Sequence, residues 1–149
     1  MITELHSILL VEDNPNDAEL TLIALGENNL ANKVEWVHDG VEALDYLYRR
    51  GAWEHRMNGQ PVVILLDLKM PRVDGREVLR TVKGDPALRA IPVVVMTSSR
   101  EESDLVETYN LGVNAYVVKP VDFKEFVGAV KTVGAFWALI NEPPPNLGK

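Results

Sequence analysis

Short hydrophobic runs recur along the chain, separated by longer segments of mixed polarity. Four runs are strongly apolar, too short for helices and rich in β-branched residues, which is typical of buried strands. They cover residues 8–11, 62–66, 93–96 and 115–118. A fifth run, residues 33–37, partly alternates polar and apolar positions and suits a half-exposed edge strand. Continuous apolar strands inside and an alternating strand at the edge favour a parallel sheet.

The segments between these runs begin with helix-capping sequences. Asn14 precedes Pro15, a residue favoured at the first helical position. Elsewhere a capping residue is followed three positions later by Glu, so that each side chain can satisfy a free backbone N–H of the other. These pairs are Asp39 and Glu42, Asp74 and Glu77, Ser99 and Glu102, and Asp122 and Glu125. The sequence therefore predicts β-α repeated five times, an α/β fold with helices on both faces of a parallel sheet and right-handed crossovers.

The last predicted helix carries more apolar side chains than one face needs. One stripe consists of Phe126, Val130, Val133, Trp137 and Ile140, and a second set, Phe123, Val127, Phe136 and Leu139, widens it. We expect one continuous helix whose first stripe faces the sheet and whose surplus faces a protein partner, because monomers rarely expose a large apolar patch. The alternative is a helix that is simply buried more deeply.

The remaining segments predict a single domain. Residues 51–61 form a polar connection, and residues 142–149 form a Pro-rich tail that we expect to be extended or frayed. Residues 1–141 are therefore expected to fold as one domain. The length of 149 residues, with 46% hydrophobic and 25% charged residues, fits one globular core.

Charge and cysteine content exclude several function classes. Lys and Arg number 15 against 22 Asp and Glu, so the net charge is −7, and without a basic patch we expect no nucleic-acid partner. The absence of cysteine excludes disulfides, thiolate nucleophiles and Cys-based zinc sites. The N-terminal apolar run is too short for a signal peptide core or a membrane span, so we expect a cytoplasmic protein with no membrane partner.

Chemically informative residues follow the predicted strands directly. In open α/β sheets ligands bind beyond the carboxyl ends of the strands, and this edge collects three carboxylates, a hydroxyl and an ammonium. They belong to Glu12, Asp13, Asp67, Thr97 and Lys119. A single Asp after a strand is more often a cap or turn residue. Three carboxylates together, however, repel one another unless a cation neutralises them, and magnesium suits an open site of oxygen ligands. A nucleophilic carboxylate beside a metal, with Lys119 and Thr97 to hold phosphoryl oxygens, fits phosphoryl transfer to an Asp.

From about Leu5 to Trp137 the sequence resembles a response-regulator receiver domain of bacterial two-component signalling. The resemblance is carried by residues 9–14 (LLVEDN), 65–71 (LLDLKMP) with Asp74 and Gly75, 95–98 (VMTS) and 116–120 (YVVKP). Each motif alone is modest, but the set in this order and spacing is specific. The resemblance implies the flavodoxin-like strand order 2-1-3-4-5. It also implies a signalling module, not an enzyme.

The resemblance implies a role for each matched residue. Asp67 would accept a phosphoryl group from a phosphohistidine of a partner histidine kinase. Mg²⁺ would be held by Asp67, by Asp13, by Glu12 through a water molecule and by the backbone carbonyl of Lys69. The sequence departs from the usual pattern at two positions. Glu12 stands where Asp is more common. Ser98 stands where many relatives carry Ala, so the lifetime of the aspartyl phosphate stays open.

The resemblance also implies a switch. Thr97 and Lys119 would bind the phosphoryl group, and the peptide bond between Lys119 and Pro120 would be cis. Thr97 would then vacate space into which Tyr116 turns. The alternative for Tyr116 is a half-buried aromatic that only packs against its neighbours.

A narrower similarity concerns the stand-alone regulators paired with bacterial and cyanobacterial phytochrome histidine kinases. It is carried by residues 74–79, residues 91–95 and the ending Phe136-Trp137 with its Pro-containing tail. It implies a homodimer formed through the fourth and fifth helices and the fifth strand. The side chains expected at that interface are Phe123, Val127, Phe136 and Trp137.

Three other interpretations are weaker. A phosphatase of the haloacid dehalogenase type needs a second Asp two positions after the nucleophile, where this chain has Lys69, a poor proton donor and acceptor at neutral pH. A phosphorylation-silent interaction module would not need the complete set of site residues. A flavin or nucleotide binder is disfavoured because the turn after the first strand lacks glycines.

Overall fold

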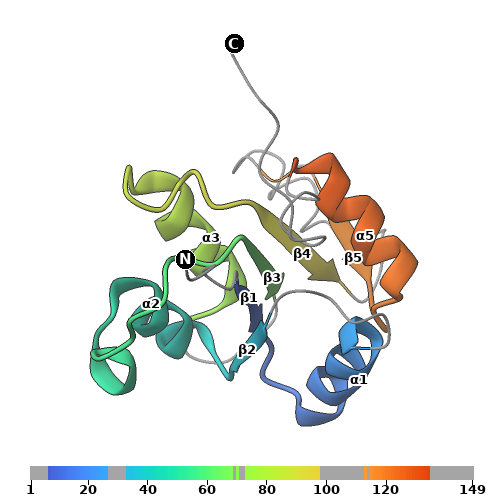
Figure 1. Ribbon diagram of the computed structural model, residues 1–149, viewed down its shortest axis with the longest axis horizontal. Helices are drawn as coiled ribbons and strands as arrows, with labels where there is room; N and C mark the ends of the chain where they lie inside the picture. Colours follow the sequence, from blue (N-terminus) through green and yellow to red (C-terminus); the bar gives the residue numbers. More distant parts are fainter. Residues whose placement is uncertain are drawn as a thin grey trace, which may run out of the picture.

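The computed structural model describes residues 7–26, 33–68, 70, 73–97, 113 and 115–134. Within these ranges strands and helices alternate along the chain (Figure 1). The strands are β1 (Ser7–Val11), β2 (Lys33–Val37), β3 (Val63–Asp67), β4 (Val93–Thr97) and β5 (Tyr116–Val118). The helices are α1 (Pro15–Gly26), α2 (Gly40–Tyr48), the short 3₁₀ helix η1 (Gly51–Trp53), α3 (Gly75–Gly84) and α5 (Phe123–Thr132).

The five described strands form one parallel sheet in the order β2-β1-β3-β4-β5. This confirms the predicted fold class and strand order. The register pairs Leu10 of the central strand β1 with Trp36 of β2 and with Leu65 of β3. As the pattern predicted, β1 is buried along its whole length, whereas β2 at the sheet edge is partly exposed.

Successive side chains of each strand enter two different hydrophobic layers. Leu9, Leu66 and Val95 belong to the layer that includes residues of α2 and α3, whereas Leu10, Leu65 and Met96 belong to the layer that includes residues of α1 and α5. Figure 1 shows the same division, with α1 and α5 on one side of the sheet and α2 and α3 on the other. Because both faces are covered, the inner strands β1, β3 and β4 are mainly apolar, as expected for a parallel sheet.

Each described helix with a predicted capping residue begins where the capping sequence places it. Asn14 Oδ1 accepts from the backbone N–H of Asn16 and of Asp17, and Asp39 Oδ1 accepts from that of Glu42. Asp74 and Asp122 cap α3 and α5 in the same manner. The side chain of Glu42 accepts from the backbone N–H of His38, one residue before the position that the capping pattern predicts. The predicted start at Ser99 lies outside the described residues.

The helix α5 is shorter than the apolar stripe predicted. It ends at Thr132, and Gly134 has a positive φ of 78°. A continuous helix through Ile140 is therefore wrong, because the left-handed conformation of Gly134 interrupts the helical hydrogen bonding. The predicted inner stripe is confirmed as far as Val133, since Phe126 and Val130 are fully buried and the partly buried Val133 packs against the same layer. The rest of the stripe, Trp137 and Ile140, lies outside the described residues.

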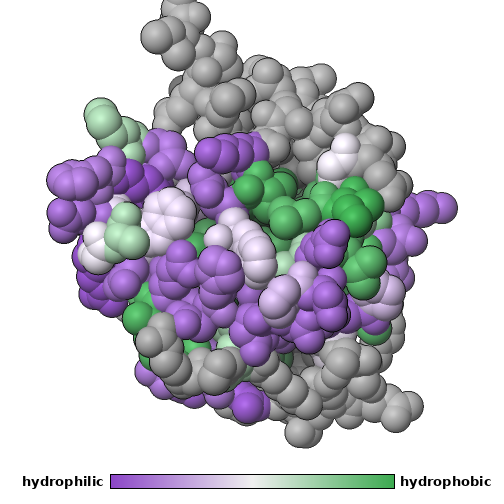
Figure 2. Space-filling model, turned by 90° about the horizontal axis from the view of Figure 1, so that it is seen from below, coloured by the Kyte–Doolittle hydropathy of each residue, from purple (hydrophilic) through white to green (hydrophobic). Residues whose placement is uncertain are grey.

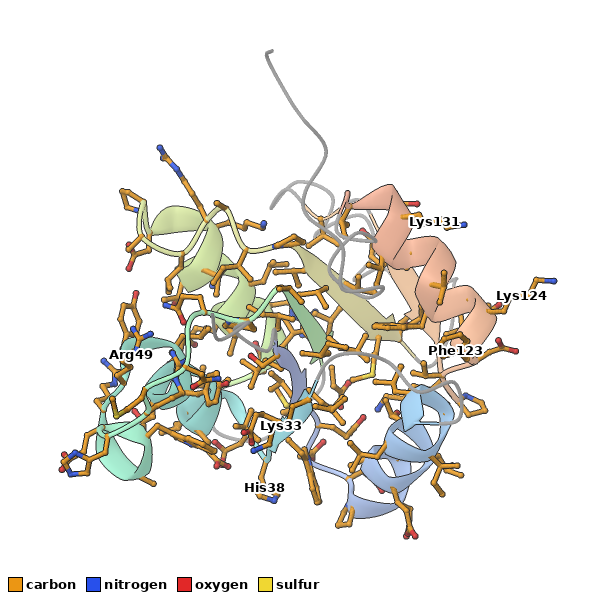
Figure 3. The ribbon with its side chains drawn as sticks, in the orientation of Figure 1. Lys33, His38, Arg49, Phe123, Lys124 and Lys131 are labelled. Atoms are coloured by element: carbon orange, nitrogen blue, oxygen red, sulfur yellow. The ribbon has the colours of Figure 1, made fainter. Side chains whose placement is uncertain are left out.

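The side chains expected at a dimer interface fall into two groups. Phe123 and Val127 are half-buried, and Val127 packs against the layer between α5 and the sheet. Figure 3 shows Phe123 near the start of α5 and shows Lys124 and Lys131 pointing away from the sheet. Phe136 and Trp137 lie outside the described residues. Among the described helices, none has the length and apolar character needed to cross a membrane.

Candidate functional site

The predicted site residues lie at one edge of the sheet, where the parallel strands end. Glu12 and Asp13 directly follow β1, Asp67 ends β3, Thr97 ends β4 and Lys119 directly follows β5. One carboxylate oxygen from each of Glu12, Asp13 and Asp67 lies within 4.8 Å of the other two. Glu12 and Asp67 are buried, and Asp13 is more exposed. Sequence and topology therefore bring the three predicted carboxylates together.

Glu12 is fixed at both its backbone and its side chain. Its N–H donates to the carbonyl of Val37, and its carbonyl accepts from the indole Nε1 of Trp36 at 2.7 Å. Its Oε2 accepts from the backbone N–H of Asn14 at 3.1 Å. Its fully buried Oε1 makes no well-aligned hydrogen bond, and the Nζ of Lys119 lies 2.8 Å from it as an ion-pair partner. Glu12 thus presents one oxygen that is available to a cation.

Burial raises the pKa of Glu12 from its ordinary value of 4.5 to about 7. The ion pair with Lys119 opposes this shift, and the negative charge of Asp67 adds to it. Desolvation and a neighbouring like charge both disfavour the ionised carboxylate. The acidic cluster is therefore an environment in which additional positive charge is stabilising.

Lys119 reaches the centre of this cluster. Its Nζ lies 2.8 Å from Glu12 Oε1, 3.2 Å from Asp67 Oδ2 and 3.2 Å from Asp17 Oδ2. Burial alone lowers the pKa of Lys119, but the contact with Glu12 and the charge of Asp67 outweigh it and raise the pKa above its ordinary value. The ammonium is therefore charged at all physiological pH values.

Asp17 is the site residue that the sequence analysis missed. It lies in the first turn of α1, and its contact with Lys119 joins two segments that are 102 residues apart. A signal was present, because the cap Asn14 fixes the start of α1 at the carboxyl edge of the sheet. An acidic residue in the following turn therefore lies beside the predicted site.

Thr97 and Tyr116 lie on the same face of the sheet. Val95 pairs in register with Tyr116, and Thr97 is two residues beyond Val95, so alternation places all three side chains on one side. Thr97 is buried, and the half-buried Tyr116 packs against the layer that includes α2 and α3. The backbone N–H of Lys119 donates to the carbonyl of Thr97 at 2.8 Å. The peptide bond between Lys119 and Pro120 is cis.

The segment after Asp67 depends on a close backbone approach. The N–H of Gly75 donates to the carbonyl of Leu68 at 2.9 Å. A Cβ at Gly75 would lie 2.2 Å from the carbonyl oxygen of Asp67 and 2.5 Å from the Cα of Leu68. Only glycine allows α3 to start this close to the end of β3. Lys69, whose carbonyl was predicted to bind the metal, lies outside the described residues.

The donor set fits a hard divalent cation. It offers carboxylate oxygens from three residues within 4.8 Å, among them the buried, poorly hydrogen-bonded Oε1 of Glu12. Mg²⁺ and similar ions prefer such oxygen ligands and commonly use only one or two carboxylates from the protein. A divalent ion would also offset the burial and the repulsion from Asp67 that together raise the pKa of Glu12.

Comparison with known proteins shows the family. Residues 8–131 match the model of the response regulator receiver domain. The chain belongs to this family, whose members are signalling modules of two-component systems and have a histidine kinase as partner. It is 41% identical over 139 residues to a probable methanogenesis regulatory protein, FilR2, of Methanothrix harundinacea, covering 92% of this chain and 86% of that protein. It is 38% identical to the response regulator Rcp1 of Synechocystis sp., covering 87% of each chain.

Solved structures agree with this assignment. The bacteriophytochrome response regulator AtBRR has a TM-score of 0.87 and 61% identity, over 94% of this chain and 100% of the other. The phosphorylated cyanobacterial phytochrome response regulator RcpA has a TM-score of 0.74 and 39% identity, over 95% of this chain and 99% of the other. The Mn²⁺-bound form of Rcp1 has a TM-score of 0.73 and 37% identity, over 94% of this chain and 99% of the other.

Proposed function

We propose that this protein is a stand-alone response regulator that accepts a phosphoryl group on Asp67 from a sensor histidine kinase. In this reaction an oxygen of the Asp67 carboxylate forms a bond to the phosphorus of the kinase phosphohistidine. The P–N bond breaks, its electron pair stays with the imidazole, and the imidazole takes up a proton from solvent. No further reactant is needed, and the product is an aspartyl phosphate.

The position of Lys119 carries this proposal. Its ammonium lies 3.2 Å from Asp67 Oδ2, so it is within reach of a phosphoryl group attached to that carboxylate. Cations fixed around the oxygens of a transferring phosphoryl group are the main means by which proteins promote this reaction. Thr97, the last residue of the neighbouring strand, is buried beside the same edge and could donate its hydroxyl proton.

We propose Mg²⁺ as the cofactor, held by Asp13, Asp67 and the carbonyl of Lys69, with Glu12 acting through a water molecule. Bound there, the ion would neutralise charge on the phosphoryl oxygens. The similarity to Rcp1, solved in a Mn²⁺-bound form, supports a divalent ion as the cofactor. The carboxylates of Glu12, Asp13 and Asp67 would attract the ion, and the ammonium of Lys119 provides a second positive charge beside Asp67.

Thr97 and Tyr116 form the proposed switch. A phosphoryl group adds about −1.5 to −2 charge and strong acceptor oxygens, and it shifts a conformational equilibrium only by binding one state better. Thr97 would make that unequal contact. Because Tyr116 lies on the same face of the sheet, a movement of Thr97 changes the space open to its ring.

We further propose that the input is a phytochrome-type histidine kinase and that the regulator acts in the cytoplasm as a homodimer. The similarity to the phytochrome response regulators AtBRR and RcpA supports the kinase type. The half-buried Phe123 near the start of α5 supports a protein contact there, whereas Val127 packs within the domain. Residues 1–141 would form the receiver domain and residues 142–149 the tail.

A hydrophobic surface beside the site supports docking of a protein partner. α1 begins at the carboxyl edge of the sheet, and its Leu20 and Ile23 are 51% and 54% exposed. Figure 2 views the protein from the side on which α1 lies in Figure 1, and hydrophobic side chains gather on this surface among polar ones. A kinase domain covering it would bring its phosphohistidine close to Asp67.

Phosphotransfer from an autophosphorylated phytochrome-type kinase tests this proposal. We expect label to pass to the wild type and to the control Asp45→Asn. Asp45 lies on α2, away from the site, and its carboxylate pairs with Arg50. Asp67→Asn should accept none. Label on Asp67→Asn would refute the assignment of the acceptor. Failure with this kinase class, together with acceptance from another, would refute only the phytochrome input.

A further inference from the structure

Asp17 occupies a place that the proposed phosphoryl chemistry does not explain. Its Oδ2 lies 3.2 Å from the Nζ of Lys119, yet the three carboxylates that lie together as possible metal ligands do not include it. It is partly exposed at the rim, whereas Glu12 and Asp67 are buried. Asp17 therefore contacts the ammonium from the solvent side of the site.

The backbone of Asp17 is held in place. Its N–H donates to Oδ1 of the capping residue Asn14 at 3.1 Å, and its carbonyl accepts from Oγ1 of Thr21 at 2.9 Å. These contacts fix the first turn of α1, so the carboxylate is presented to Lys119 from a rigid element. Lys119 in turn follows β5, and its backbone is tied to β4 through Thr97.

Three carboxylates surround the ammonium of Lys119, and its contact with Asp17 is a hydrogen bond of 3.2 Å. A lysine ammonium has three donors, and the Nζ has three carboxylate neighbours, Glu12, Asp17 and Asp67. An incoming phosphoryl oxygen must take a share of this donor capacity. A divalent ion would compete with Lys119 for the carboxylates of Glu12 and Asp67. Asp17 is not among the carboxylates that lie together as possible metal ligands, so the ion would not compete for it. With a divalent ion bound, Asp17 is therefore the carboxylate that still competes with the phosphoryl group for the ammonium of Lys119.

We propose that Asp17 is a positioning residue that holds the Lys119 ammonium at the rim of the site and competes with the phosphoryl group for it. This inference rests on the proposed function. Its effect is to weaken the binding of phosphoryl oxygens in the unphosphorylated protein. Asp17 thereby sets how readily the site accepts an anionic phosphodonor.

Substitution of Asp17 separates charge from hydrogen bonding. Asp17→Asn keeps an acceptor oxygen without the charge, Asp17→Ala removes both, and Asp17→Glu restores the charge. We expect Asp17→Asn and Asp17→Ala to bind beryllofluoride about three- to tenfold more tightly and to react with acetyl phosphate faster by a similar factor, because one negative charge beside the ammonium is gone. Asp17→Glu should behave like the wild type.

Glu19→Gln is the matched control, since it removes the same charge from an exposed position two residues along α1. We expect it to leave both quantities unchanged. Urea unfolding of each variant verifies that all are folded at the assay temperature. The proposal is overturned if Asp17→Asn matches the wild type, or if Glu19→Gln gains as much as Asp17→Asn. A wild type that neither binds beryllofluoride nor reacts with acetyl phosphate would refute the proposed function, and this inference with it.

Discussion

The indole Nε1 of Trp36 donates a 2.7 Å hydrogen bond to the backbone carbonyl of Glu12. Trp36 lies on the edge strand β2, and Glu12 is the first residue after the central strand β1. The bond therefore ties the exposed edge of the sheet to the backbone of the acidic site. Because the partly exposed indole of Trp36 is bonded to Glu12, its fluorescence should depend on changes at Glu12.

Binding of Mg²⁺ should change the fluorescence of Trp36. The ion alters the field and the geometry at Glu12, and the indole is bonded directly to that residue. We expect the change to disappear in Trp36→Phe and to persist in Trp53→Phe, because Trp53 bonds to Glu42 instead. A magnesium titration of the three proteins measures this. A signal that survives in Trp36→Phe would contradict Trp36 as its source.

Metal-free protein should lose stability as the pH rises from about 5 to about 7. The pKa of Glu12 is raised from 4.5 to about 7, so the folded state keeps a proton in this range that the unfolded state releases. The unfolding free energy therefore decreases with pH through this window, and the stabilisation is fully present only below the unfolded pKa.

Glu12→Gln provides the comparison for this pH dependence, because it cannot ionise. Urea unfolding in EDTA at several pH values between about 5 and 8 should show a steeper decline for the wild type than for Glu12→Gln. Saturating Mg²⁺ should flatten the wild-type curve. Parallel curves for the two proteins in EDTA would contradict a raised pKa of Glu12.

Gly75→Ala should destabilise the protein by about 1–3 kcal/mol, because the new Cβ must displace the backbone of Asp67 and Leu68. Gly128→Ala is the opposite case, since no atom lies within 4 Å of its Cβ position in the middle of α5. It should stabilise by about 0.5–1 kcal/mol. Thermal unfolding of both variants tests the close approach of α3 to β3. Equal changes in stability for Gly75→Ala and Gly128→Ala would contradict this close approach.

Arg56→Ala should cost about 2–3 kcal/mol, because this guanidinium organises the segment after η1. It stacks 4.1 Å from the ring centre of Tyr46 and donates to the carbonyls of Tyr46 and Gly59 and to the side chain of Gln60. Arg56→Lys should recover less than half of the loss, since lysine lacks the planar fork. His55→Ala, at a side chain that is 92% exposed, is the neutral control for urea unfolding. A cost below about 1 kcal/mol for Arg56→Ala would contradict this role.

The strands and caps could be predicted because they depend on local pattern. The apolar run before Glu12 and the cap at Asp74 act within a few residues, and both appear where the sequence placed them. The meeting of Asp67 and Lys119 at one edge of the sheet could be predicted as well, because the carboxyl ends of parallel strands lie at the same edge. Position relative to the strands was therefore sufficient to predict that Glu12, Asp13, Asp67 and Lys119 lie together, but not that Asp17 joins them.

Other features depend on tertiary contacts that no local pattern contains. The segment around Arg56 has the pattern of a polar connection, yet its guanidinium packs on Tyr46, ten residues earlier in the chain. The contact between Asp17 and Lys119 spans 102 residues. The end of α5 was missed for a different reason, because the apolar periodicity runs past Gly134 while the backbone there turns left-handed.

Intact-mass analysis after incubation with acetyl phosphate tests the central claim most directly. We expect the wild type to gain a single phosphoryl group only when Mg²⁺ is present, and Asp67→Asn to gain none while keeping its fold. Lys119→Ala should react poorly. A phosphoryl group on Asp67→Asn, or a wild type that stays unmodified and also fails to bind beryllofluoride, would contradict the assignment of Asp67 as the phosphoacceptor.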